Sequence, residues 1–182
     1  MDFLGRCAGV GIGCFRVRGR QSVRAQLLSA EEAAGVATRV RAEGGKVVFT
    51  NGVFDLLHPG HVRYLQEARA LGDALIVGVN SDRSTRRIKG ADRPINPEHE
   101  RAEVLLALAS VDAVVIFDEE TPHAIVSTLQ PDILVKGADW GPNEIIGRDV
   151  VEARGGQVVR IALSPGHSTT QLLTKVQKTS RF

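Results

Sequence analysis

The amino-acid sequence predicts an α/β fold, a three-layer sandwich built around a five-stranded parallel sheet. Short apolar runs rich in Val and Ile alternate with segments of helical pattern along most of the chain. The runs are apolar at successive positions, which is typical of strands that are buried on both faces. Strand–helix alternation at this spacing indicates parallel strands covered by helices on both sides. Ligands of such sheets bind beyond the carboxyl ends of the strands, near a topological switch point.

The regular pattern begins with a helix whose N-cap is Ser29. Glu31 and Glu32 lie in its first turn, where the helix dipole favours acids, and Gly44-Gly45 ends it. Strands are then expected at residues 46–50, 74–79, 113–117, 133–135 and 158–161. Helices are expected between and after them, at residues 61–71, 97–109, 122–129, 148–154 and 169–176.

The N-terminal residues differ in composition from the remainder of the chain. Against one acid, Asp2, the first 24 residues contain five arginines: Arg6, Arg16, Arg18, Arg20 and Arg24. We expect residues 1–28 to be a disordered extension and residues 29–182 to form one folded domain, a size that allows a substantial core.

Composition excludes several classes of function for this domain. Both cysteines, Cys7 and Cys14, lie in the extension, so neither a disulfide framework nor a zinc cluster is expected in the domain, and a reducing cytoplasm is the simplest location. The net charge of +2 argues against a general nucleic-acid binder. Membrane insertion is not expected, because every apolar run is shorter than the roughly 20 residues needed to span a bilayer.

The clearest candidate site follows the strand at residues 46–50. Gly52 permits a sharp turn close to a ligand, and Pro59 suits the first turn of a helix. His58 and His61 are three residues apart, so they can share one face at the start of that helix. Free backbone N–H groups make a helix N-terminus an anion site, where two imidazoles can stabilise charge on a phosphate. The alternative is that the two histidines are capping and surface residues.

Further polar residues lie at other points of the same predicted edge. Asn80 follows the second strand, and Lys89 ends a basic run before Gly90, which suggests a mobile loop that closes over phosphates. A solvated charged face is the alternative for that run. Lys136 and Asp139 follow the fourth strand, where they could bind a ligand or pair with each other.

Three more positions complete the set of candidates. Ser168 opens the last predicted helix, where hydroxyls and free N–H groups form a second anion site, or simply an N-cap. Arg101 and Asp112 could form a structural ion pair.

Residues 50–61, TNGVFDLLHPGH, resemble the HxGH loop of the cytidylyltransferase-like nucleotidyltransferases. Matching pieces follow at residues 79–82, 87–90, 93–94, 135–140 and 168–170, and together they are most similar to the heptose 1-phosphate adenylyltransferases. The resemblance covers residues 29–176. It implies the Rossmann-like nucleotidylyltransferase fold and transfer of AMP from ATP to D-glycero-β-D-manno-heptose 1-phosphate, with release of pyrophosphate.

The resemblance also implies roles for individual residues. It assigns catalysis to His58, His61 and Lys89. Nucleotide binding is implied for Asn51, Gly52, Phe54, Asp55, Asn80, Arg101, Ser168, Thr169 and Thr170. Binding of the sugar phosphate is implied for Asp112, Lys136, Asp139 and Trp140. Mg²⁺ is expected with ATP, and Asp55 either supports that ion or orients a histidine. A homodimer in the cytoplasm is expected.

Two other functions compete with this interpretation. The first is a cytidylyltransferase of the same fold that acts on another small phosphate, such as glycerol 3-phosphate. The second is a nucleotide-binding module without catalysis. A dinucleotide-dependent oxidoreductase does not fit, because Gly52 stands without a second glycine at the spacing that a dinucleotide-binding loop requires.

Overall fold

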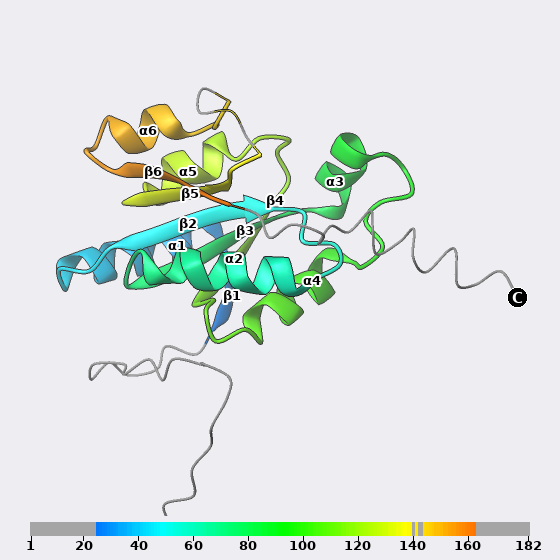
Figure 1. Ribbon diagram of the computed structural model, residues 1–182, viewed down its shortest axis with the longest axis horizontal. Helices are drawn as coiled ribbons and strands as arrows, with labels where there is room; N and C mark the ends of the chain where they lie inside the picture. Colours follow the sequence, from blue (N-terminus) through cyan, green and yellow to red (C-terminus); the bar gives the residue numbers. More distant parts are fainter. Residues whose placement is uncertain (1–24, 140, 142–143, 163–182) are drawn as a thin grey trace, which may run out of the picture.

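The computed structural model describes residues 25–139, 141 and 144–162, and shows one sheet of six parallel strands (Figure 1). The strands are β1 (Gln26–Leu28), β2 (Val47–Gly52), β3 (Ala74–Asn80), β4 (Ala113–Phe117), β5 (Ile133–Gly137) and β6 (Gln157–Ile161). The helices are α1 (Ala30–Ala42), α2 (Pro59–Ala70), α3 (Asp82–Lys89), α4 (Glu98–Leu106), α5 (His123–Leu129) and α6 (Arg148–Glu152). The strand order is β1-β4-β3-β2-β5-β6, so the chain reverses direction across the sheet after β4.

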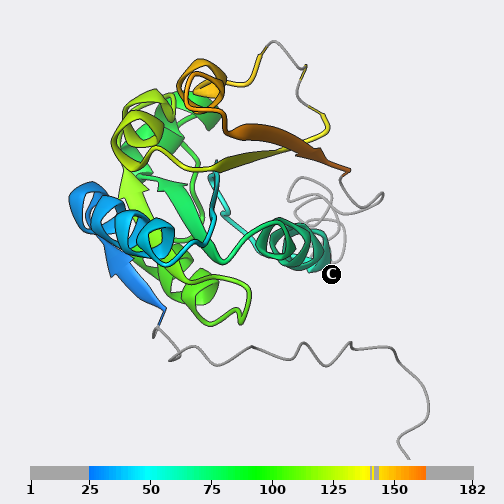
Figure 2. The same cartoon turned by 90° about the vertical axis from the view of Figure 1, so that its left-hand side faces the viewer.

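Helices cover both faces of the sheet, which confirms the predicted three layers (Figure 2). Val48 belongs to a core cluster with residues of α2 and α4, whereas its neighbour Phe49 belongs to a cluster with residues of α1, α5 and α6. Successive side chains of a strand point to opposite faces, and here each face has its own core. This is why the strand sequences are continuously apolar.

The prediction of five strands was wrong, because β1 adds a sixth. It pairs with β4 in parallel, with Gln26 opposite Ala113 and Leu28 opposite Val115, at the edge of the sheet. It lies within residues 1–28, which were assigned to the extension. Three residues, two of them exposed, are too few to show a periodic pattern, and their partner strand lies far along the chain.

Local sequence signals predicted the start of α1 correctly, but they did not predict that α3 is a helix. Ser29 accepts a hydrogen bond from the backbone N–H of Glu32, and the Glu32 side chain accepts one from the Ser29 N–H, so the two form a capping box. The basic run, expected as a mobile loop, is helix α3, which lies beyond the carboxyl ends of the central strands (Figure 1).

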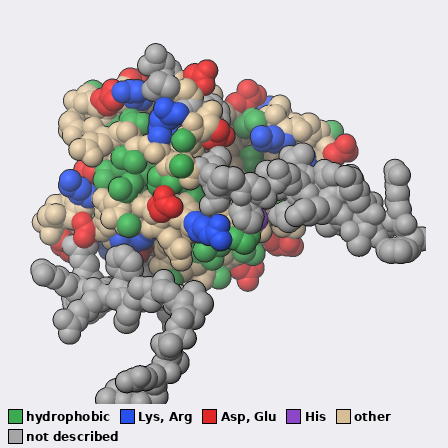
Figure 3. Space-filling view, viewed as in Figure 1, with side chains coloured by type: hydrophobic (Ala, Val, Ile, Leu, Met, Phe, Trp, Pro, Cys, Tyr) green, Lys and Arg blue, Asp and Glu red, His purple; other side chains and the backbone are tan. Residues whose placement is uncertain are grey.

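The described surface carries charges of both signs. Basic and acidic side chains are interspersed over the face shown in Figure 3. Among the described helices, none is long and apolar enough to cross a membrane.

Candidate active site

The strand order brings three of the predicted segments to one edge of the sheet. β2 lies between β3 and β5, so Gly52, Asn80 and Gly137 end neighbouring strands. The chain leaves the carboxyl end of β2 towards α2, and that of β3 towards α3. The described residues at the carboxyl ends of these three strands therefore surround the switch point of the sheet.

Lys136 and Asn51 meet at this edge. Lys136 is buried at the end of β5, and its Nζ donates a hydrogen bond to Oδ1 of Asn51 on β2. Burial lowers the pKa of Lys136 to about 8, and the negative charge of Asp139 offsets part of that effect. A cation held in a site that disfavours its charge is stabilised when an anion binds beside it.

The two histidines form a stacked pair at the start of α2. His58 is the N-cap, and its Nδ1 accepts from the backbone N–H of His61 at 3.4 Å. The ring centroids are 3.8 Å apart with an interplanar angle of 21°. The ring of Phe54 packs edge-on against His61 at 5.5 Å. The pair thus stands at a helix N-terminus, where backbone N–H groups attract anions.

The environment of His61 keeps its ring neutral at physiological pH. Burial, and next the neighbouring charge of His58, lower the pKa of His61 to about 4. Its Nδ1 is buried without a hydrogen-bond partner among the described residues. A neutral imidazole still donates one N–H, and a bound phosphate would supply the negative charge that favours a second proton.

Gly52 is needed for a reason other than the one expected. A Cβ at this position would lie 3.2 Å from Cε2 of Phe54, tighter than ordinary contacts. Phe54 itself has a φ of 48°, in the left-handed region. The absence of a side chain at Gly52 therefore lets the Phe54 ring fold back next to His61.

The comparisons with known proteins agree with this geometry. Residues 49–172 match the family model described as cytidylyltransferase-like. The chain belongs to the cytidylyltransferase-like family. The prediction of a nucleotidyltransferase with a Rossmann-like parallel sheet is thereby confirmed.

Similar curated proteins are considerably longer than this chain. The bifunctional protein HldE of Hyphomonas neptunium is 52% identical over 152 residues, which are 84% of this chain and 31% of that protein. The bifunctional protein HldE of Geotalea uraniireducens is 50% identical over 153 residues, again 84% of this chain and 31% of the relative. The chain spans about a third of the length of these relatives.

Solved structures share the fold. The lipopolysaccharide core biosynthesis protein from Thermoplasma volcanium is 34% identical with a TM-score of 0.55, and the match covers 66% of this chain and 98% of that one. A protein with unknown function from Archaeoglobus fulgidus matches at 22% identity and a TM-score of 0.52, which shows the fold alone.

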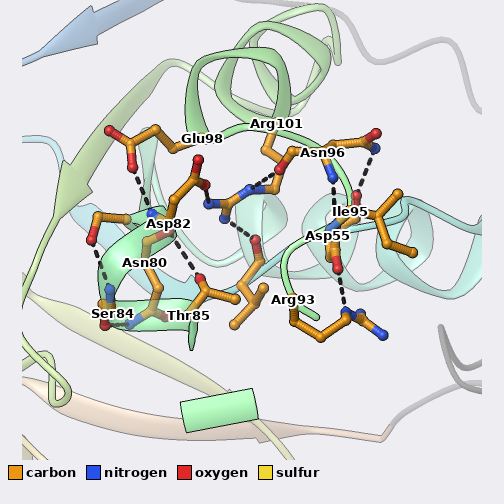
Figure 4. A network of polar contacts seen from close by, with 12 residues as sticks. Asp55, Asn80, Asp82, Ser84, Thr85, Arg93, Ile95, Asn96, Glu98 and Arg101 are labelled. Atoms are coloured by element: carbon orange, nitrogen blue, oxygen red, sulfur yellow. Dashed lines mark hydrogen bonds and ion pairs between the residues drawn. The ribbon is translucent and has the colours of Figure 1, made fainter. Parts of the chain in front are cut away.

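Within this cytidylyltransferase-like site, Asp55 has a role that the sequence did not predict. Its carboxylate accepts from Arg93 Nε at 2.6 Å and from the backbone N–H groups of Ile95 and Asn96 at 2.8 and 3.0 Å (Figure 4). The side chain is fully buried. These contacts join Asp55 to the segment after Lys89. They do not involve a histidine, although orienting a histidine was one of the two roles expected for Asp55.

Arg101 is also engaged by the protein itself. Its guanidinium is buried and donates to Asp82 Oδ1 at 2.8 Å, to the carbonyl of Asn96 at 2.9 Å and to the carbonyl of Val53 at 2.5 Å (Figure 4). Direct contact with a nucleotide was the expectation for this residue. The structure instead shows a side chain that joins three segments around the site.

Asp112 does not belong to this edge of the sheet. It precedes β4 and so lies at the amino end of the strands, where it accepts from the Leu75 N–H at 2.7 Å and pairs with Arg69 Nε at 2.9 Å. This position does not fit the assignment of Asp112 to the sugar phosphate, and the alternative of an ion pair with Arg101 was wrong, because Arg101 pairs with Asp82. The assignment came from the resemblance alone, whereas a residue directly before a parallel strand lies at the amino edge of the sheet.

The basic residues of α3 have different partners. Arg83 pairs with Asp118, and Arg87 Nε lies 3.1 Å from Glu120, so both hold α3 against the segment after β4. Lys89 is the exposed last residue of α3, before Gly90 at a φ of 99°. Asn80 is buried beside this helix and donates to Ser84 Oγ at 3.0 Å.

The remaining predicted residues are described in part or not at all. Asp139 is exposed just after β5. Trp140, Ser168, Thr169 and Thr170 lie outside the described residues.

Sequence reasoning missed a hydroxyl pair beneath the histidines. Thr50 Oγ1 and Tyr64 Oη are buried and 2.7 Å apart, which ties α2 to β2. Burial raises the pKa of Tyr64 above its usual range. The signal was available in the spacing, because Tyr64 is three residues after His61 and Thr50 immediately precedes Asn51.

Proposed function

We propose that the chain transfers AMP from ATP to D-glycero-β-D-manno-heptose 1-phosphate, giving ADP-heptose and pyrophosphate for lipopolysaccharide assembly. The observation that carries the proposal is the stacked pair of His58 and His61 at the N-terminus of α2, at the edge of the sheet where the buried Lys136 lies at the end of the neighbouring strand β5. The similarity to the HldE proteins over 84% of this chain supports the heptose substrate.

The chemistry requires no general base. An oxygen of the sugar phosphate attacks the α-phosphorus of ATP, and the bond from that phosphorus to the oxygen bridging to the β-phosphate breaks. Pyrophosphate leaves with the bonding electrons. The attacking phosphate is already an anion near pH 7, since its second pKa is about 6. The protein therefore has to position two anionic substrates and stabilise the charge of the transition state.

The scheme gives roles to described residues and to predicted residues that lie outside the described part of the chain. His58 and His61 donate to oxygens of the reacting phosphates, and the α2 N-terminus adds backbone N–H groups. Lys89 balances the charge of the triphosphate, and Lys136 that of the sugar phosphate. Ser168, Thr169 and Thr170 are proposed to hold the nucleotide, and Trp140 and Asp139 the sugar.

Mg²⁺ is proposed to arrive with ATP, held by phosphate oxygens and water. The described residues contain no group of three or more His, Cys, Asp or Glu that would hold a metal ion. Asp55, the one expected protein ligand, already accepts from Arg93, Ile95 and Asn96. A homodimer and a cytoplasmic location, where ATP is available, remain part of the proposal.

Pyrophosphate release tests the function directly. The purified protein is incubated with Mg²⁺, heptose 1-phosphate and each of ATP, CTP, GTP and UTP in turn. Release with ATP is expected, and His61→Ala should reduce kcat by about 10²–10³-fold, the usual cost of removing a donor to a developing charge. His99→Ala, a change of an exposed histidine on α4, is the matched control and should retain full activity.

The alternatives give different results in the same assay. Release with CTP alone would keep the mechanism and overturn the choice of base. Release only with another acceptor, such as glycerol 3-phosphate, would overturn the sugar. Nucleotide binding without any release would leave a binding module and refute the proposed reaction.

A further inference from the structure

The contacts of Asp55 and Arg101 connect the loop that leads into His58 with the segment that carries Lys89. Val53 and Asp55 lie in that loop, Asp82 is the first residue of α3, and Asn96 follows Lys89 by a few residues. Arg101 binds Asp82 at one end of this segment and the Asn96 carbonyl at the other, while it also binds the Val53 carbonyl. The segment from Asp82 to Asn96, which contains Lys89, is thus held at both ends against the loop that leads into His58.

Asp55 adds a second set of contacts at the end that follows Lys89. Its carboxylate holds Arg93, Ile95 and Asn96, and the Asn96 side chain donates back to the Asp55 carbonyl at 2.9 Å. Four hydrogen bonds therefore link one residue of the loop to a segment about 40 positions later. Both charged groups are buried within these contacts, and buried charges persist only where such partners satisfy them.

From this arrangement we infer that Asp55 and Arg101 are positioning residues, which fix Lys89 relative to the His58–His61 pair. Together with Arg93 they form what we call the loop tie. The inference rests on the proposed function, because it assumes that Lys89 and the histidines act on the same phosphates. A displacement of about 1 Å in a group that orients substrates can cost about 10²-fold in rate. The loop tie is the contact that prevents such a displacement.

Arg93 is the best member of the loop tie to change. Its side chain is partly exposed, whereas those of Asp55 and Arg101 are completely buried, so Arg93→Ala is the variant most compatible with folding. We expect Arg93→Ala to lower kcat by about 10–100-fold, with the KM for ATP changed by less than about threefold. Arg93→Lys, which keeps the charge, should recover part of the rate. Asp92→Ala, a truncation of the adjacent exposed residue, is the control and should behave as the wild type.

A double-mutant cycle shows whether the loop tie acts through Lys89. If it does, Arg93→Ala should lower kcat by no more than about twofold in a protein that already carries Lys89→Ala. Equal losses in both backgrounds would mean that Arg93 acts independently of Lys89, and would overturn the inference. An unchanged kcat in Arg93→Ala, accompanied by a lower melting temperature, would mean that the loop tie has a purely structural role. That result would also overturn the inference.

Hydrogen exchange tests the contacts without any substrate. In Asp55→Ala the amides of Ile95 and Asn96 lose their acceptor, and their exchange should accelerate at least about tenfold. The amide of Val77 in the central strand β3 should stay protected and thereby show that the fold is intact. Unchanged exchange at Ile95 and Asn96 would refute the loop tie. Absence of turnover in the wild type would end the proposed function and with it the positioning role for catalysis, whereas the contacts of the loop tie would still be tested separately by the exchange result.

Discussion

The two edges of the sheet use polar residues in opposite ways. At the amino edge, an aspartate stands just before each of three strands, at positions 73, 112 and 132. Their carboxylates accept the backbone N–H groups of Lys46, Leu75 and Val47 at 2.7–2.8 Å. Two of them also pair with arginines, at 2.9 Å to Arg69 and 3.8 Å to Arg41.

At the carboxyl edge, burial disfavours the charged forms of two groups, Lys136 and His61. The pKa values of Lys136 and His61 are both lowered by burial, and Nδ1 of His61 has no partner among the described residues. Carboxylates at the amino edge satisfy backbone donors and so stabilise the fold. Cationic and imidazole groups at the carboxyl edge are less stable in the protein alone, and a bound anion would relieve that cost. We propose that this difference separates residues that serve the structure from residues that serve binding.

Lys136→Met should give the largest effect and the clearest contrast between the edges. Activity should fall about 100-fold, because the cation for a substrate phosphate is lost. Thermal stability should stay the same or rise, since the variant no longer buries a disfavoured charge. Steady-state kinetics and a melting curve measure the two effects. A variant that loses activity and stability together would contradict the assignment of Lys136 to binding.

The pH dependence of unfolding should reveal the burial of His61. The pKa of His61 is about 4 in the folded protein, below the ordinary value of 6.5, so the unfolded chain binds the extra proton first as the pH falls. Stability should therefore decline below about pH 6.5, by at most about 1.4 kcal/mol per pH unit.

The comparison of two histidine variants isolates this effect from the titration of carboxylates. Denaturant unfolding is measured between pH 7 and 5 for His61→Asn and for His99→Asn. The decline of stability with falling pH should be flatter in His61→Asn than in the wild type, and unchanged in His99→Asn. Equal slopes in the wild type and both variants would show that burial does not lower the pKa of His61.

Asp112→Ala should show the reverse pattern from Lys136→Met. The Leu75 N–H is buried, and loss of its acceptor should cost about 1–3 kcal/mol in the free energy of unfolding. Turnover at a temperature well below the transition should match the wild type, because Asp112 lies at the edge opposite the histidines. A loss of activity in folded Asp112→Ala would restore this residue to the substrate site.

Tyr64→Phe should give the smallest effect. It removes the hydrogen bond to Thr50 but keeps the aromatic packing, and the expected loss is about 1 kcal/mol. Thr50→Val is the matched change from the other side, and the double variant should cost less than the sum of the two. Chemical denaturation of the three proteins measures this coupling. Simple additivity would mean that the hydroxyl pair contributes nothing to holding α2 on β2.

Much of the site was predictable because its signals are local. Asn51, Gly52, His58 and His61 follow one strand and begin one helix, so sequence spacing alone brings them together. Lys136 and Asn80 lie at the carboxyl ends of the two strands that flank β2, and the parallel sheet places such ends at one edge. Contacts that the sequence did not predict join Asp55 to Arg93, Arg101 to Val53 and Asp112 to Leu75, residues that lie 37–48 positions apart along the chain.

The sequence by itself determined five of the six strands, the start of α1 and the loop that leads into His58 and His61. These depend on apolar runs, capping residues and spacings of three or four residues, all of which act within a few positions of the chain. Only the tertiary structure decided that β1 joins the sheet, that Asp112 binds Arg69 and the Leu75 N–H, and that Asp55 and Arg101 bind protein groups. Each of these outcomes depends on which distant donors and acceptors the packed sheet brings within hydrogen-bond distance, because a buried charge is stable only where such partners meet it.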